Sequence, residues 1–172
     1  MKDRFEGRPG SNPDHRDDLR PAEAMQWSRL EEIGDLHFHA SAFSSALDYY
    51  GRLLGEEVLD HLLLEQATGL LRKSVRAALN LGRLGLAESL LQQAGTVIDA
   101  ADAAPDELSR LRAVFQSRWA DLLVQRGSYH QALDVAKHAF ACLAVTDEHT
   151  EVADLQVTMG ACHQRLGRLD KA

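Results

Sequence analysis

The sequence predicts an all-α fold built from helical hairpins that stack on one another, and three observations support this prediction. One phrase recurs along the chain: a small residue, a spacer, an apolar residue, two spacers and an alanine. Hydrophobic residues make up 45% of the 172 positions, and most of them are leucine and alanine, which favour helices. No segment carries a convincing strand pattern. Repeats of this length are typical of stacked architectures, which usually bind through a surface rather than catalyse in a pocket.

The chain divides into a short leader and a helical domain. Residues 1–20 mix glycine, proline, asparagine, aspartate and arginine without periodicity, which predicts a disordered leader. The helical pattern begins at Pro21, because a proline suits the first turn of a helix, and residues 21–172 are assigned to one repeat domain. In chain order, helices are expected at about residues 21–40, 43–54, 57–81, 84–101, 105–126, 129–144 and 147–166, with Thr68-Gly69 as a point that could divide the third.

Local signals justify several of these boundaries. Gly55 follows the second helix, and glycine is common just after a helix end. Pro105 is followed by two acidic residues, which interact favourably with a helix N-terminus. Thr146 precedes Asp147 and Glu148, and it is therefore the expected N-cap of the last full helix.

The recurring phrase has a physical interpretation in each hairpin. Its alanine is expected where the second helix crosses the first too closely for a larger side chain. Its apolar residue packs at the turn, and its glycine adopts a positive φ. Hairpins are expected at about residues 24–55, 57–101 and 105–144, with an incomplete unit at 147–172. The residues concerned are Ala46, Ala87, Ala132 and Ala172, then Phe43, Leu84, Tyr129 and Leu169, and finally Gly82, Gly127 and Gly167.

At these residues the chain resembles the tetratricopeptide repeat (TPR) superfamily. The first hairpin adds Gly34 and Tyr50 at family spacing, the third adds Ala120, and the fourth adds Gly160. The resemblance implies a right-handed α-α superhelix, a TPR-like solenoid of about 3.5 hairpins. The alanines of the phrase are 41, 45 and 40 residues apart, against about 34 in the standard repeat. Such long periods resemble the extended-helix variants of kinesin light chains and of the sensory regions of some bacterial transcription activators.

The resemblance also implies a function: a module that binds a peptide or helix of a partner protein in a concave groove lined by the first helix of each hairpin. Arg72, Arg76 and Asn80 lie at i, i+4 and i+8 on one helix face, which favours an acidic partner. An ordinary solvated charged face is the alternative explanation of this spacing. The expected groove residues are Phe38, Arg72, Arg76, Asn80, Asp121, Gln125, Gln164 and Arg165, and the same helix faces also carry Glu31, Asp35, His39, Ser117, Val124 and Val157.

A second hypothesis treats the chain as the N-terminal sensory region of a larger bacterial transcription activator or signalling protein. It rests on the fourth copy of the phrase, which stops at its own alanine, Ala172, and leaves the last unit uncovered. A stand-alone adaptor could instead form a homodimer through that uncovered C-terminal end.

Composition argues against several other classes. The net charge of −7 argues against nucleic-acid binding by this segment, because phosphate neutralisation needs clustered lysine and arginine. The N-terminus lacks the apolar core of a signal peptide and no stretch approaches 18 apolar residues, so a cytoplasmic protein without membrane contact is expected. Cys142 and Cys162 lack the spacing of a zinc site and are expected to be reduced.

No catalytic site, metal or cofactor is expected either. The chain has eight histidines but neither an HExxH motif nor a pair at i and i+4. It also lacks a GxSxG motif and a phosphate-binding glycine loop. His37 and His163 are expected to pack within their hairpins. Trp27 and Trp119 are expected in the core, although such residues also serve as interface anchors.

Overall fold

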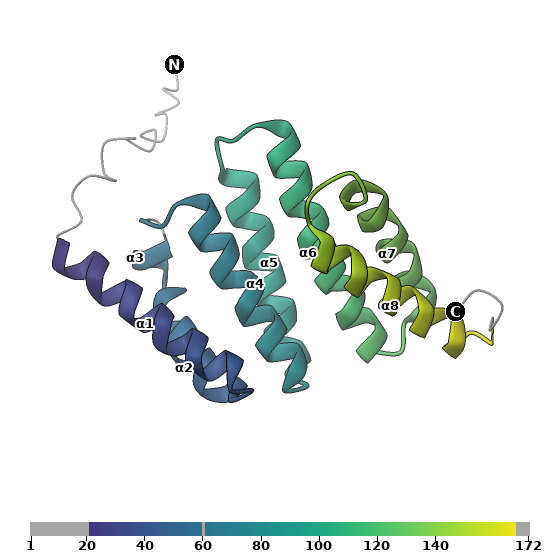
Figure 1. Cartoon of the computed structure of the whole chain (residues 1–172), viewed down its shortest axis with the longest axis horizontal. Helices are drawn as coiled ribbons and strands as arrows, with labels where there is room; N and C mark the ends of the chain where they lie inside the picture. The colour runs from purple at the N-terminus through teal and green to yellow at the C-terminus, as the bar shows by residue number, and fades with distance from the viewer. Residues whose placement is uncertain (1–20, 60, 168–172) are drawn as a thin grey trace, which may run out of the picture.

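The computed structural model describes residues 21–59 and 61–167, and every regular element in these residues is helical (Figure 1). The predicted all-α fold is thus confirmed. The predicted leader at 1–20 and two residues of the fourth phrase, Leu169 and Ala172, lie outside the described residues. The helices are α1 (Pro21–His39), α2 (Phe43–Leu53), α3 (Glu56–Leu59), α4 (Leu64–Asn80), α5 (Leu84–Ala100), α6 (Pro105–Gln125), α7 (Tyr129–Leu143) and α8 (His149–Arg165).

The long helices pair into hairpins that follow one another in chain order. Helix α1 packs on α2, α4 on α5, and α6 on α7, while α8 packs on α7. The first helices of successive hairpins also touch, since α4 contacts α1 and α6 contacts both α4 and α8. In Figure 1 the hairpins form a row from left to right, with α1 and α8 in front of α2 and α7. Helices α1, α4, α6 and α8 therefore form one layer of the molecule, and α2, α5 and α7 form the other.

Each hairpin turn contains one residue with a positive φ. Gly82, Gly127 and Gly167 have φ values of 67°, 78° and 71°, as predicted for the glycine of the phrase. Ser41 holds the same place in the first hairpin with a φ of 58°, which is less favourable for a residue that carries a side chain. The amide of each of these residues donates to the carbonyl three residues earlier, as from Gly82 to Leu79 at 3.0 Å. The phrase therefore encodes one turn that recurs along the chain.

The alanines of the phrase that lie within the described residues are buried in the core. Ala46, Ala87 and Ala132 are completely buried, as predicted. In the first hairpin the close approach is made by Gly34, because a Cβ atom there would lie 2.5 Å from Cε1 of the buried Tyr50. The Tyr50 hydroxyl donates to Oδ1 of Asp35 at 2.7 Å, so the ring is held by packing and by a hydrogen bond.

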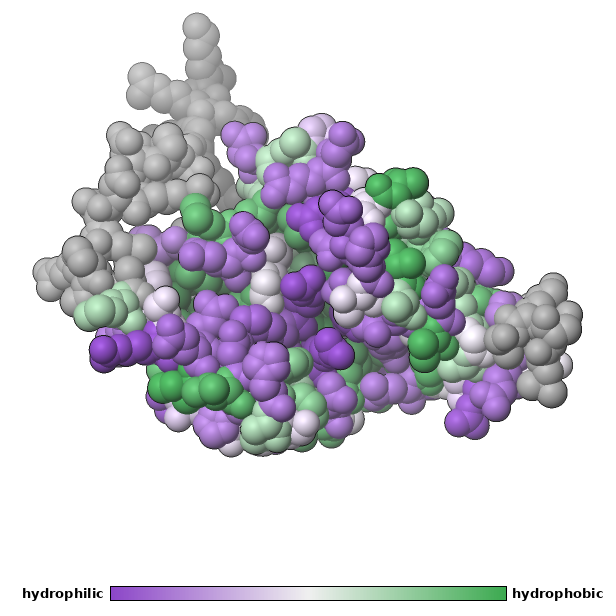
Figure 2. Space-filling view, viewed as in Figure 1, coloured by the Kyte–Doolittle hydropathy of each residue, from purple (hydrophilic) through white to green (hydrophobic). Residues whose placement is uncertain are grey.

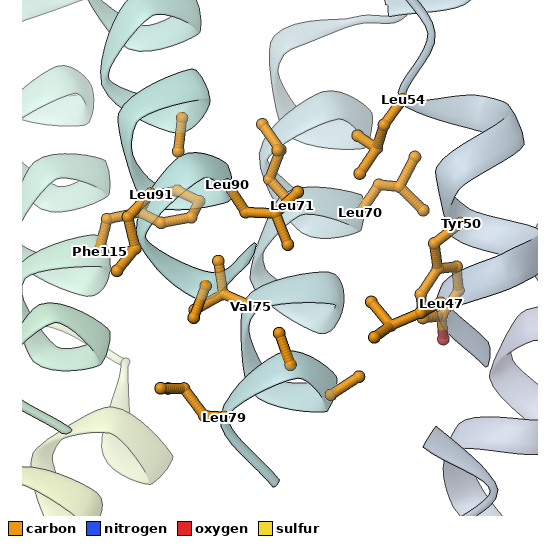
Figure 3. Packing of buried hydrophobic residues seen from close by; sticks show 14 of the residues in the cluster. Leu47, Tyr50, Leu54, Leu70, Leu71, Val75, Leu79, Leu90, Leu91 and Phe115 are labelled. Carbon is orange, nitrogen blue, oxygen red and sulfur yellow. The ribbon is translucent and has the colours of Figure 1, made fainter. Parts of the chain in front are cut away.

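The hydrophobic core runs through the hairpins rather than filling one centre. Its largest cluster extends from α2 through α4 and α5 to α6, and Figure 3 shows Tyr50, Leu71, Leu91 and Phe115 among its members. Smaller clusters join α6, α7 and α8. Trp27 and Trp119 are partly buried and pack against the largest cluster, in agreement with the core prediction. Each hairpin thus depends on its neighbour to cover its apolar side chains.

The prediction of one helix at 57–81 is wrong. Helix α3 ends at Leu59, and α4 begins at Leu64. Leu63 is extended, with φ −64° and ψ 152°, and its amide donates to the Gln66 side chain at 3.2 Å, which starts the new helix. Thr68 does not divide α4, because it is buried and its hydroxyl donates to the Leu64 carbonyl at 2.7 Å.

The predicted N-cap of the last full helix is also wrong. Glu148 is the N-cap residue of α8. Thr146 instead lies at the end of α7, where its hydroxyl donates to the Leu143 carbonyl at 2.8 Å. The same hydroxyl oxygen accepts a long hydrogen bond from the Glu148 amide at 3.4 Å. A threonine near a helix start can bond to the preceding helix, and here that bond prevails.

The close contact between Gly34 and Tyr50 is testable by substitution. Gly34→Ala is expected to destabilise the protein by about 1–3 kcal/mol, because the methyl group overlaps the Tyr50 ring. Gly51→Ala, in the same hairpin, is expected to stabilise by about 0.5–1 kcal/mol, since nothing lies within 4 Å of the added atom. Urea unfolding of the two variants measures this difference in sign, and a neutral Gly34→Ala would contradict the close packing.

Candidate functional site

Helices α1, α4, α6 and α8 carry a continuous polar surface on the side away from the other layer. Figure 2 shows hydrophilic residues over most of the middle of the visible side, with hydrophobic residues in separate patches. We call this surface the polar face. It comprises Phe38, Arg72, Lys73, Arg76, Leu79, Asn80, Arg118, Asp121, Val124, Gln125, Glu148, Thr150, Glu151, Asp154, Val157 and Thr158, which line two adjoining hollows.

Arg118 of α6 is the central residue of the polar face. It is only 4% exposed, and a buried cation is tolerated only when anionic partners surround it. Its guanidinium lies 2.9 Å from Asp154, 3.2 Å from Asp121 and 3.5 Å from Glu151. Burial alone would lower the Arg118 pKa, but these carboxylates outweigh it, so that the pKa is raised and the residue stays charged.

Glu151 connects the Arg118 cluster to the neighbouring hairpin. Arg72 of α4 lies 3.2 Å from Glu151 and 3.8 Å from Glu148. Glu148 also pairs with Arg110 of α6. Ion pairs from α4 and α6 therefore converge on the first turn of α8, and the Arg72 pair reaches α8 from a helix that is two positions earlier in the layer.

Burial and neighbouring groups shift the pKa of Asp121 in opposite directions. Burial raises the Asp121 pKa, and the hydrogen bond from the Thr158 hydroxyl at 2.7 Å and the nearby Arg118 only partly offset this rise. The net shift is upward, so the folded protein holds a proton on Asp121 more readily than the unfolded chain does. The carboxylate thus contributes an ion pair but at a cost in desolvation.

A second polar cluster joins α1 to α4. The Lys73 ammonium donates to Asp35 at 2.8 Å and to Glu31 at 3.0 Å. Burial acts to lower the Lys73 pKa, yet both carboxylates act more strongly, and the pKa is raised. Asp35 also accepts the Tyr50 hydroxyl bond, and burial together with this acceptor raises the Tyr50 pKa. The cluster therefore fixes α1 against both α2 and α4.

Two hollows of similar size lie along the polar face. One, of about 310 Å³, lies between α4, α6 and α8, and the other, of about 300 Å³, reaches from α4 to α1 and the start of α8. Arg76 and Arg118 line both hollows, so the hollows adjoin. Val157 lines the first hollow with 72% of its surface exposed. The floor is thus charged, while an apolar side chain stands open at the rim.

The structure brings most of the predicted groove residues to these hollows. Phe38 and Arg72 line the second hollow, and Arg76, Asn80, Asp121 and Gln125 line the first. Gln125 also donates to the Leu79 carbonyl at 3.3 Å, which ties α6 to α4. The remaining two predictions lie elsewhere: Gln164 and Arg165 are exposed at the end of α8 and line neither hollow.

Ser117 was predicted to lie on a helix face that lines the groove, and this prediction is wrong. It is 2% exposed and its hydroxyl donates to the Val114 carbonyl, so it is a core residue. Sequence reasoning also missed Arg118, Glu151, Asp154 and Thr158, which form the centre of the site. A usable signal was present, because the last three lie at i, i+3 and i+7 on one face of α8.

The described residues offer little for metal or thiol chemistry. Nowhere in 21–59 and 61–167 are three histidine, cysteine or acidic side chains placed to hold a metal ion together. Cys142 is partly buried, Cys162 is buried, and both are free thiols. Burial raises the Cys162 pKa, which disfavours the reactive thiolate.

Comparison with models of known protein families finds no match to the chain, and comparison with curated protein sequences finds none either. Within the described residues, none of the helices combines the length and apolar character needed to cross a membrane.

The burial of Arg118 leads to a stability prediction. Arg118→Met is expected to cost about 3–5 kcal/mol, because it leaves Glu151 and Asp154 without their main buried partner. Arg126→Met, which removes an exposed pair with Glu88 at 2.6 Å, is the matched control and is expected to cost far less. Urea unfolding of both variants at pH 7 measures the losses, and similar losses would show that Arg118 has no central role.

The raised Asp121 pKa leads to a prediction about pH. A carboxyl with a raised folded-state pKa contributes stability that is present below the unfolded pKa and lost as pH rises through the folded pKa. Asp121→Asn cannot lose a proton, so its stability relative to the wild type is expected to rise as the pH increases from about 4 through the raised folded-state pKa of Asp121. Glu88→Gln is expected to show the opposite slope, but at lower pH, below the ordinary value of 4.5, since the Arg126 hydrogen bond lowers the Glu88 pKa. Slopes of the same sign in thermal unfolding would contradict both assignments.

Proposed function

We propose that this protein is an interaction module that binds a peptide or helix of a partner protein on its polar face. In this proposal the row of hairpins is a right-handed TPR-like solenoid, and the polar face is its concave groove. The recurring turn at Ser41, Gly82, Gly127 and Gly167 and the buried alanines of the phrase support the proposal, because both belong to the pattern on which the resemblance rests. The role is binding rather than catalysis.

The observation that carries the proposal is the pair of adjoining hollows along α1, α4, α6 and α8. They offer charged groups at the floor and exposed or partly exposed apolar groups at Phe38, Val124 and Val157. An extended peptide or a helix can cover such a surface with apolar anchors while its polar groups meet the floor.

The charge preference of the polar face rests on Arg76 rather than on Arg72. Glu148 and Glu151 already neutralise Arg72. Arg76 is exposed, lines both hollows and forms no ion pair with any residue in 21–59 or 61–167. A carboxylate of the partner would gain a charge-assisted contact there without displacing an internal one. The proposed partner therefore carries an acidic group next to an apolar one.

Two exposed valines provide a matched test. Peptides selected from a random library displayed on phage would be measured against purified variants by fluorescence polarisation. Val157→Asp is expected to weaken binding at least tenfold, or about 1.4 kcal/mol, because it places a charge in the apolar contact. Val145→Asp, at an 89% exposed site that lines neither hollow, is expected to leave affinity unchanged.

The preference for an acidic partner is tested in the same experiment by the sequences of the peptides that each variant selects. Arg76→Glu is expected to abolish selection of peptides that carry aspartate or glutamate, while Arg72→Gln changes it less. A library that yields only peptides insensitive to Val157→Asp would show that the polar face is not the binding surface.

A further inference from the structure

The outward face of α1 has a composition that packing within the hairpin does not explain. Met25 is 58% exposed, Leu36 is 71% exposed and Ile33 is 38% exposed. Exposed apolar residues are common singly, but three on one helix face form a stripe. Gly34, which packs on Tyr50, lies on the opposite side of the helix, so the stripe points away from the core.

The stripe follows the spacing of a helix-pairing seam. Met25, Arg29, Glu32 and Leu36 are separated by four, three and four residues and fall within about 60° of one another around the helix. This is the spacing of the a and d positions that meet a partner helix in a coiled coil. Ile33 lies at one edge of the seam. All four seam residues are exposed in the described structure.

The order of the residues makes the stripe complementary to itself. When two such helices lie antiparallel and Arg29 meets Glu32 of the second copy, the same operation places Met25 against Leu36 of that copy. Both contacts then occur twice, as the two-fold symmetry of an isologous dimer requires. The two Met25–Leu36 contacts flank two Arg29–Glu32 ion pairs, whereas a parallel arrangement in register would place like charges together.

We propose that two copies of this protein associate through antiparallel pairing of α1 with α1 of the second copy. Helix α1 belongs to the first hairpin, at one end of the row, so no other described hairpin lies beyond it (Figure 1). From the sequence, a homodimer through the C-terminal end was considered instead, and α1 lies at the other end of the row. The association leaves the hollows of the polar face lined as they are, because Met25, Arg29, Glu32 and Leu36 line neither of them.

The dimer is expected to be weak and dependent on concentration. One pair of helices of this length covers less than the roughly 1,200 Å² of total surface that a standard interface buries. The dissociation constant is accordingly expected on the order of 100 µM.

Sedimentation equilibrium of the full 172-residue chain in reducing buffer tests the proposal directly. The wild type is expected to shift from 19.0 kDa toward twice that mass as its concentration rises to about 1 mM. Leu36→Asp is expected to weaken association at least tenfold. Val145→Asp, which changes a similarly exposed apolar residue outside α1, is the matched control and is expected to leave it unchanged.

A charge-reversal experiment separates the proposed geometry from a general loss of stability. Arg29→Glu and Glu32→Arg are each expected to weaken self-association at least tenfold, because each brings like charges together. An equimolar mixture of the two variants is expected to associate at least as tightly as the wild type, since both charged contacts of the seam then join opposite charges and the Met25–Leu36 contacts are unchanged. A misfolded variant would not regain association in the mixture.

Three results would overturn the proposal. The first is a wild type that remains monomeric at every concentration up to about 1 mM. The second is a dimer whose dissociation constant is unchanged by Leu36→Asp, which would place the contact on another surface. The third is a mixture of the two charge variants that stays monomeric although the wild type dimerises.

Discussion

The structure depends most on a constraint imposed by one buried cation. Arg118 is almost fully enclosed, and such a group is stable only when carboxylates are held close to it. Two of those carboxylates, Glu151 and Asp154, come from α8, so α8 must pack against α6 in a way that keeps them beside Arg118. Because Glu151 also pairs with Arg72, the same requirement reaches α4. Ion pairs that include Arg118 and its partner Glu151 thus link α4, α6 and α8, and these residues line the hollows of the polar face.

Within each hairpin, a different constraint operates. A positive φ at the turn and a small residue at the helix crossing let the two helices approach closely, as Gly82 and Ala87 do in the second hairpin. These features are local, and they repeat because the phrase repeats. Contacts between hairpins are not repeated in this way: the α1–α4 junction uses Lys73 with two carboxylates, whereas the α6–α8 junction uses Arg118. The hairpins are therefore alike, but the polar face differs along its length.

This difference explains why the turns were predicted and the centre of the polar face was not. Gly82 and Gly127 each precede the alanine of the phrase by the same number of residues, so a local sequence pattern was enough to predict the turns. Arg118 looked like any charged residue in an amphipathic helix, and its burial follows from a helix more than thirty residues later. Arg72 was correctly placed near the hollows, but its partner Glu151 is 79 residues away, and no local spacing reveals such a pair. The break before α4 was missed for a related reason, since an apolar run reads equally well as a continuous helix until the Leu63 backbone is seen to be extended.

The sequence by itself determined the helical class of the protein and the hairpin turns, because these depend on residues within about one turn of each other. It also placed the buried alanines, since helix crossings recur with the phrase. Only the tertiary structure decided which charges are neutralised internally and which remain open. Arg72 and Arg76 lie four residues apart on the same helix, yet Arg72 meets Glu151 while Arg76 stays exposed beside the hollows. That distinction depends on how α8 packs, because the electrostatic environment of a side chain is set by everything near it in space and not by its neighbours in the chain.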